Sequence, residues 1–111
     1  LQQPAWFKLA CGKIDSALED CNQSIKINRA SSTAYDTRSI AYYLQGKYQL
    51  ADQDLVTAIR RNNKDGAFYY HRTLTLIALG KAEDAKVALA RYRELDYKPE
   101  AWEPKVPANI N

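Results

Sequence analysis

The sequence is poor in the residues from which metal sites and nucleophilic active sites are built. Its 111 residues include no methionine, one histidine and two cysteines. Cys11, Cys21 and His71 cannot supply a closed tetrahedral zinc site from thiolate and imidazole ligands alone. No serine or thiol has a reason to face His71, and a single helical histidine is ordinarily a surface or hydrogen-bonded residue. We therefore expect no enzyme activity, no metal and no cofactor.

Long hydrophobic runs and a strong charge of one sign are also missing. No apolar stretch approaches the roughly 20 residues that a membrane-spanning helix needs. The net charge is +3 and the basic residues are spread along the chain, so a nucleic-acid partner is not expected. The chain opens without methionine. We expect a processed or trimmed product, which leaves the cytoplasm open and, if a signal was removed, the periplasm.

Glycine is scarce, and three of the four glycines directly precede a lysine. A phosphate-binding loop reads GxxxxGK followed by serine or threonine, because backbone N–H groups cradle the phosphates and the hydroxyl holds magnesium. The residues after the three lysines are Ile14, Tyr48 and Ala82, and no glycine stands five positions before the Gly-Lys pairs. The pairs are therefore not nucleotide loops.

The Gly-Lys pairs instead mark a repeat, because Gly12, Gly46 and Gly80 are 34 residues apart. Two columns of small residues keep the same interval: Ala17, Ala51 and Ala85, and Ala5, Ser39 and Thr73. A 34-residue period predicts stacked helix–turn–helix units, in which each glycine ends a first helix and the small columns let paired helices approach closely. Apolar spacing predicts helices near residues 2–11, 14–27, 32–45, 48–61, 66–79 and 82–95.

The period and the segments AYYLQGKYQLADQDLVTAIRRN and YYHRTLTLIALGKAEDAKVALARYREL resemble tetratricopeptide repeats of the bacterial type. The resemblance implies an all-α fold of three tandem repeats in a short right-handed α-solenoid, about residues 1–28, 29–62 and 63–96, followed by a tail, 97–111. It is weaker in the first unit, where Pro4 and Lys8 replace apolar residues. The proline that usually ends each unit is replaced by Arg29, Asn63 and Tyr97, which leaves the helix junctions less sharply defined.

Two charged columns suggest how the units are joined. Arg38 and Arg72 share one repeat position, while Asp20 and Asp54 share another, where the third unit has Ala88. We expect inter-repeat pairs, Arg38 with Asp20 and Arg72 with Asp54. The alternative is pairing within a unit, Arg38 with Asp54, or no pairing at all.

The resemblance also implies a concave groove lined by the first helix of each unit. It places there Gln2, Trp6, Leu9, Ala10, Thr33, Asp36, Ile40, Tyr43, Leu44, Ala67, Tyr70, Leu74, Ile77 and Ala78. Co-chaperone members of the family grip a peptide carboxylate with lysine, asparagine and arginine, but the matching positions here are Gln2, Trp6, Thr37, Ala67 and His71. The expected peptide-binding residues are Trp6, Asp36, Ile40, Tyr43, Tyr70, His71, Leu74 and Ile77.

The segment DYKPEAWEPKVPANIN has three prolines in nine residues, which rules out a long helix. Trp102, with Tyr97, is expected to cap the third unit; alternatively the tail lies in its own or a neighbour's groove. Cys11 ends one helix while Cys21 lies about two turns into the next, so a separation of roughly 10 Å is beyond the reach of a disulfide. Two buried free thiols are expected.

These features predict a non-enzymatic module that binds a peptide or helix of a partner protein in an apolar groove. The alternative is a structural module that associates with itself, for example as a homodimer. A helical-repeat RNA binder is a weaker third interpretation, which a steep salt dependence of nucleic-acid binding would support.

Overall fold

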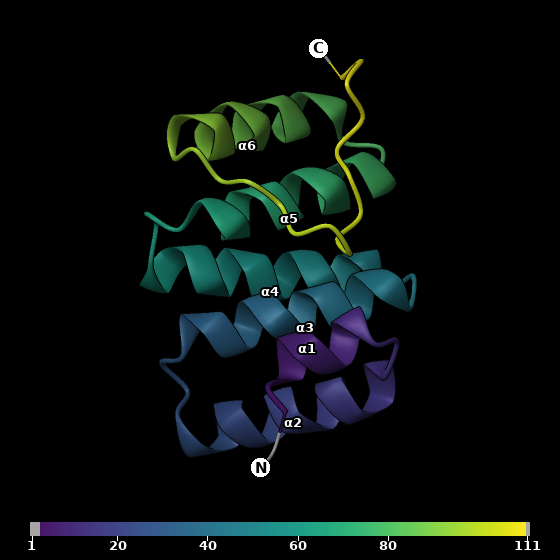
Figure 1. The fold of residues 1–111 in the computed structure, drawn as a ribbon. Helices are drawn as coiled ribbons and strands as arrows, with labels where there is room; N and C mark the ends of the chain where they lie inside the picture. The colour runs from purple at the N-terminus through teal and green to yellow at the C-terminus, as the bar shows by residue number, and fades with distance from the viewer. Residues whose placement is uncertain (1–2, 111) are drawn as a thin grey trace.

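The computed structural model describes residues 3–110, which form six α-helices and no strand. The helices are α1 (Ala5–Ala10), α2 (Ile14–Ile27), α3 (Ser32–Leu44), α4 (Tyr48–Arg61), α5 (Gly66–Ala78) and α6 (Ala82–Glu94). Figure 1 shows them stacked along one direction, from α2 at one end to α6 at the other. The all-α repeat architecture predicted from the 34-residue period is therefore confirmed. None of these helices is long and apolar enough to cross a membrane.

The helices pack as three successive pairs, α1–α2, α3–α4 and α5–α6, which we call units one, two and three. Each helix contacts the next along the chain, and α3 also contacts both α1 and α5. The odd-numbered helices therefore form a continuous layer, and the even-numbered helices lie outside it. This odd-helix layer carries the candidate site.

Each Gly-Lys pair ends the first helix of a unit, as predicted. Gly12, Gly46 and Gly80 have φ values of 79°, 77° and 75°, in the left-handed region that glycine adopts at little cost. In unit two the N–H of Gly46 donates to Tyr43 O at 3.0 Å and that of Lys47 donates to Tyr42 O at 2.9 Å. These two bonds form a Schellman motif, which satisfies carbonyl groups that the helix end leaves free.

The small columns lie where the paired helices meet. Ala17, Ala51 and Ala85 are each 0% exposed, and Ser39 and Thr73 on the first helices are also buried. The hydroxyl groups of these two residues donate to carbonyl oxygens of their own helices, Ser39 to Asp36 O at 2.6 Å and Thr73 to Tyr69 O at 2.8 Å. These two buried hydroxyl groups therefore have hydrogen-bond partners without needing one from the neighbouring helix.

The first unit is shorter than predicted. The expected helix 2–11 begins at Gln2, which lies outside the described residues, and α1 itself begins at Ala5. Pro4 precedes it in an extended conformation, with φ −62° and ψ 152°. Proline disfavours helical geometry in the residue before it, so Gln3 is kept out of the helix, and with Pro4 itself extended the helix begins at Ala5.

The predicted pairing of Arg38 with Asp20 is wrong, and the alternative within unit two is the one observed. Nε and Nη2 of Arg38 donate to the two carboxylate oxygens of Asp54 at 2.8 and 2.7 Å. Nη1 of Arg38 reaches the preceding unit through Asn22 instead, at 3.0 Å. Unit one has Pro4 at the arginine position, so Asp20 accepts from Lys8 at 2.6 Å.

The predicted pairing of Arg72 with Asp54 is also wrong. Unit three has Ala88 where unit two has Asp54, so Arg72 has no partner at that position in its own unit. Its Nε donates instead to Asp52 of unit two, at 3.0 Å. Arg72 therefore does join two units, but through a different aspartate.

The two cysteines are free, as expected, but only one of them is buried. Cys21 is buried in α2, whereas Cys11 is exposed at the end of α1. The expectation of two buried thiols is wrong for Cys11, because the C-cap position of this short helix faces outwards.

Candidate functional site

The chain after α6 folds back over the odd-helix layer instead of continuing the stack. Asp96 takes the left-handed conformation at φ 55°, and the N–H of Tyr97 donates to Tyr92 O at 3.2 Å. In Figure 1 the following yellow segment crosses α5, turns near α3 and α4, and returns past α5 and α6 to the C-terminus. We call residues 97–110 the tail.

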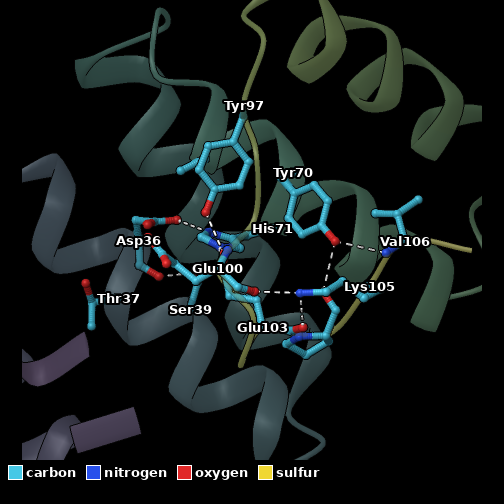
Figure 2. A network of polar contacts seen from close by, with 12 residues as sticks. Asp36, Thr37, Ser39, Tyr70, His71, Tyr97, Glu100, Glu103, Lys105 and Val106 are labelled. Atoms are coloured by element: carbon cyan, nitrogen blue, oxygen red, sulfur yellow. Dashed lines mark hydrogen bonds and ion pairs between the residues drawn. The ribbon is translucent and has the colours of Figure 1, made fainter. Parts of the chain in front are cut away.

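The tail is fastened at His71 of α5, whose ring lies between two carboxylates (Figure 2). Nδ1 of His71 is 2.7 Å from Oδ1 of Asp36 in α3, and Nε2 is 2.5 Å from Oε1 of Glu103 in the tail. All three residues are buried. Unit two, unit three and the tail are thus joined by one side chain.

The two carboxylates shift the pKa of His71 towards its charged form, and His71 does the same for the pKa of Glu103. Burial alone would lower the pKa of His71, but the charge of Asp36 and the hydrogen bonds to both carboxylates outweigh it and raise the pKa to about 10. Burial would raise the pKa of Glu103, but hydrogen bonds from His71 and Tyr97 lower it below its ordinary value. His71 is therefore an imidazolium that donates from both nitrogens. It has no lone pair left to act as a base or a metal ligand.

The second oxygen of Glu103 shapes the tail itself. Oε2 accepts from the Tyr97 hydroxyl at 2.7 Å and from the N–H of Glu100 at 2.6 Å. Lys105 Nζ closes the same turn by donating to the carbonyl oxygens of Glu100 and Glu103, at 2.5 and 2.9 Å. The carboxylate of Glu103 therefore organises the bend as well as its contact with α5.

Tyr70, next to His71, holds the backbone of the returning segment. Its hydroxyl donates to Pro104 O at 3.0 Å and accepts from the N–H of Val106, also at 3.0 Å. Its ring is packed edge-on against Tyr92 and tilted against Tyr97, with centroids 4.9 and 5.4 Å apart. Tyr70 thus binds main-chain groups two residues apart, independently of their side chains.

Apolar contacts hold the tail at two further points. Trp102 packs against the cluster of Leu9, Ala17, Ile40 and Ala41 in units one and two, and Ile110 packs against the cluster of Leu76, Ala85 and Ala88 in unit three. Between them a cavity of only about 10 Å³ remains, at the lower limit for one water molecule. This cavity is lined by Ser39, Ile40, Tyr43, His71, Leu74, Thr75, Glu103 and Pro104.

The start of the tail passes so close to α5 that only glycine fits there. A Cβ atom on Gly66 would lie 2.8 Å from Cβ of Tyr97 and 3.1 Å from Cβ of Leu95. At the other three glycines a Cβ would meet nothing within 4 Å. Gly66 is therefore needed for space, whereas the three turn glycines are needed for their backbone conformation.

Comparison with solved structures identifies the architecture, although no protein-family model matches the sequence. The first TPR domain of Spaghetti (RPAP3), solved with the HSP90 peptide SRMEEVD, superposes with a TM-score of 0.79 at 25% identity, over 83% of this chain and 73% of that one. The type III secretion translocator chaperone SycD of Yersinia enterocolitica superposes with a TM-score of 0.77 at 20% identity, over 82% and 63%. The chain has a tetratricopeptide-repeat (TPR) fold.

The TPR fold brings most of the predicted groove residues together under the tail. Tyr70 and His71 bond it directly, Asp36 holds the His71 ring, and Ile40, Tyr43 and Leu74 line the small cavity beneath it. Ile77 and Ile110 pack against the same cluster and line one pocket. Trp6 does not join them: it is 50% exposed on α1 and packs edge-on against Phe7. That any of these residues binds a partner stays a prediction.

The expected cap on unit three is wrong, and the alternative, a tail that lies in its own groove, is the one observed. Trp102 packs on units one and two, not on unit three, and the tail occupies the groove of its own TPR array. Tyr97 does contact unit three, with its ring 5.4 Å from Tyr70 and 6.1 Å from His71. Glu103 was missed because charged residues in a proline-rich segment look solvent-exposed. The available sign that Glu103 is buried was its position next to Trp102, a residue expected to pack against the repeats.

Proposed function

We propose that this TPR array is a protein-interaction module whose groove between α3 and α5 receives a non-helical segment of a partner protein. The observation that carries the proposal is that such a segment, the chain's own tail, already lies there. Tyr70 bonds its main chain, His71 bonds a carboxylate and an apolar cluster receives an aromatic side chain. Main-chain bonds supply affinity for any extended peptide, and the two side-chain contacts supply selectivity.

The structural neighbours support an interaction role of this general kind. The RPAP3 domain was solved with a bound peptide, and SycD is a chaperone of translocators. The lysine, asparagine and arginine clamp of co-chaperone TPR domains is absent here, as Thr37 and His71 illustrate. We therefore propose peptide binding through His71 and Tyr70, and not capture of a chaperone C-terminus.

Selection from a random peptide library displayed on phage tests the proposal. The bait is the full chain carrying Trp102→Ala and Glu103→Gln, which removes the two side chains that hold the tail; we call it the tail-weakened variant. Binding peptides are then measured against the same bait with Tyr43→Ala, in the groove, or Tyr42→Ala, on the same helix but packed against Arg38. We expect Tyr43→Ala alone to weaken binding. Failure to select any peptide, or equal effects of both substitutions, would contradict the proposal.

Self-association is the alternative, and exposed apolar side chains at the α1–α2 end favour it. Trp6 is 50% exposed, Phe7 37% and Ile27 78%. Sedimentation equilibrium over a wide concentration range separates the two functions. A peptide-binding module is expected to remain monomeric. A dimer that dissociates on Ile27→Ser would establish self-association through this end.

A further inference from the structure

Trp102 and Glu103 are adjacent in the tail and enter two adjacent seats in the groove. Glu103 enters the carboxylate seat, which is Nε2 of His71. Trp102 enters the apolar seat, formed by Leu9, Ile40 and Ala41. The two seats differ in how well the tail satisfies them, and this difference indicates what else binds there.

The carboxylate seat is positioned from α3, independently of the tail's own contacts. Asp36 in α3 fixes the ring of His71 through Nδ1, 2.7 Å away, so Nε2 points towards the tail whatever occupies that side. With the tail in place this N–H is buried, so removing only the Glu103 carboxylate would leave a buried, charged donor unpaired, which is costly. A carboxylate satisfies it better than an amide, because the bond is then charge-assisted.

The apolar seat is filled less well. Nε1 of Trp102 is buried, and among residues 3–110 it has no hydrogen-bond partner. The indole N–H therefore loses its hydration without gaining a bond, which offsets part of what the burial of the ring contributes. Phenylalanine offers a large apolar surface to the same seat and has no donor to leave unpaired. The tail thus carries the right charge beside an imperfect aromatic residue.

We propose, building on the peptide-binding function above, that the tail is a displaceable occupant of the groove. The partner that displaces it is an extended peptide in which phenylalanine is directly followed by aspartate or glutamate. Its carboxylate replaces that of Glu103 on His71, and its phenyl ring replaces the indole of Trp102. Its main chain takes the two bonds of the Tyr70 hydroxyl.

Displacement is possible because the tail gains its hold partly from being tethered. A short tether gives a segment an effective concentration of the order of millimolar. If the free tail peptide binds with a Kd of about 100 μM, the tether reduces the apparent affinity of a competitor only about tenfold. A peptide that fits the apolar seat better overcomes a factor of this size.

Synthetic peptides test both parts of the proposal by fluorescence anisotropy. The tail peptide spans residues 99–110. Three variants carry Trp102→Phe, Glu103→Gln or Glu100→Gln, the last removing an equal charge from an exposed side chain of the same turn. Each peptide is titrated with four forms of the full chain: the wild type, Glu103→Gln, the tail-weakened variant and Glu100→Gln.

We expect the Trp102→Phe peptide to bind the tail-weakened variant several-fold more tightly than the tail peptide. The Glu103→Gln peptide should bind roughly tenfold more weakly or worse, whereas the Glu100→Gln peptide should not. For every peptide the affinity should rise from wild type to Glu103→Gln to the tail-weakened variant. Glu100→Gln in the chain should leave it at the wild-type value. If the tail-weakened variant does not fold, Glu103→Gln alone carries the same comparison.

Three results would overturn the inference. If the tail peptide and its Glu103→Gln variant bind equally well, His71 does not select a carboxylate. If the wild-type and Glu103→Gln chains bind a peptide with equal affinity, the tail does not compete with it. A tail-weakened chain that dimerises without gaining peptide affinity would show that a second copy is the occupant. If phage-selected peptides bind the groove while all the tail-derived peptides fail, the proposed function stands and only this inference falls. If neither kind binds, both fall.

Discussion

Glu103 in the tail and His71 in α5 are joined through Oε1 and Nε2, 2.5 Å apart, although 32 residues separate them in the sequence. The other ring nitrogen of His71 is held by α3, so the pair connects an irregular segment to the centre of the repeat array. The site therefore consists of groove and tail together. Its behaviour should depend on the protonation of His71 and on every residue that lets the tail approach α5.

The first prediction concerns pH. The raised pKa of His71 means that its contribution is complete below about pH 6.5 and is lost as the pH rises towards about 10. The lowered pKa of Glu103 means that its contribution is present above about pH 4.5 and is lost as the pH falls below that. We therefore expect the tail to be held most firmly between about pH 4.5 and pH 6.5. It should be released as the pH falls below this range and as the pH rises towards about 10.

Trp102 fluorescence in a Trp6→Phe chain measures this release as a red shift of the emission. The ionisable groups that contact His71 are Asp36 from α3, Tyr70 on α5, and Tyr97 and Glu103 from the tail. Burial and the bond to Glu103 raise the pKa of Tyr97 above its ordinary value. Tyr97 therefore stays protonated over the pH range in which His71 loses its proton. A His71→Gln chain should lose the alkaline transition. A transition that persists in it would contradict the assignment to His71.

The second prediction distinguishes a glycine needed for its backbone conformation, Gly46, from one needed for space, Gly66. Gly46→Ala should destabilise the fold by roughly 1–2 kcal/mol, because alanine is strained at positive φ while no neighbour obstructs its Cβ. Gly46→Asn should cost less, since asparagine tolerates this conformation. Unfolding in urea measures both. Trp102 fluorescence should remain unchanged in the folded state of each variant.

Gly66→Ala should instead displace the tail while leaving the helices folded. Alanine is the better helix former, but its Cβ would collide with Tyr97 Cβ at 2.8 Å. The start of the tail must then move, so we expect Trp102 emission to shift to the red while the helices remain folded by far-UV circular dichroism. An unchanged emission would show that Tyr97 and Trp102 are not mechanically coupled.

The helix pattern could be predicted because it repeats, and the tail could not because it does not. The 34-residue columns locate Gly12, Gly46 and Gly80, and the turns follow from them. The partner of Arg38 was beyond this reasoning, because Asp20 and Asp54 occupy the same column and periodicity alone does not choose between them. The seat of Trp102 depends on where an irregular segment turns, and on the carboxylate of Glu103 that makes it turn.

The third prediction concerns Arg38. Its guanidinium bonds both oxygens of Asp54, a geometry that lysine cannot reproduce. Arg38→Lys should therefore cost roughly 1–3 kcal/mol of unfolding free energy in urea. The matched control is Arg72→Lys, because Arg72 has one bond to Asp52 and is more exposed, and there the cost should stay below about 1 kcal/mol. Equal costs would show that the bidentate geometry contributes nothing.

The fourth prediction concerns the thiols. Burial raises the pKa of Cys21 to about 12, and the residue is only 2% exposed, so its thiolate is scarce and shielded. Cys11 is exposed. Ellman's reagent should modify one thiol per folded chain quickly and the second only on unfolding. Cys11→Ser should abolish the fast phase, and a fast phase that survives would place Cys21 at the surface.

The occupation of the groove by the tail is tested most directly by NMR. In the full chain near pH 6, where His71 is protonated, we expect NOEs between the indole ring of Trp102 and the side-chain methyls of Ile40 and Ala41. Their intensity should not depend on protein concentration. Random-coil shifts for residues 97–110 without these NOEs would contradict the groove-bound tail, as would NOEs found only between differently labelled chains.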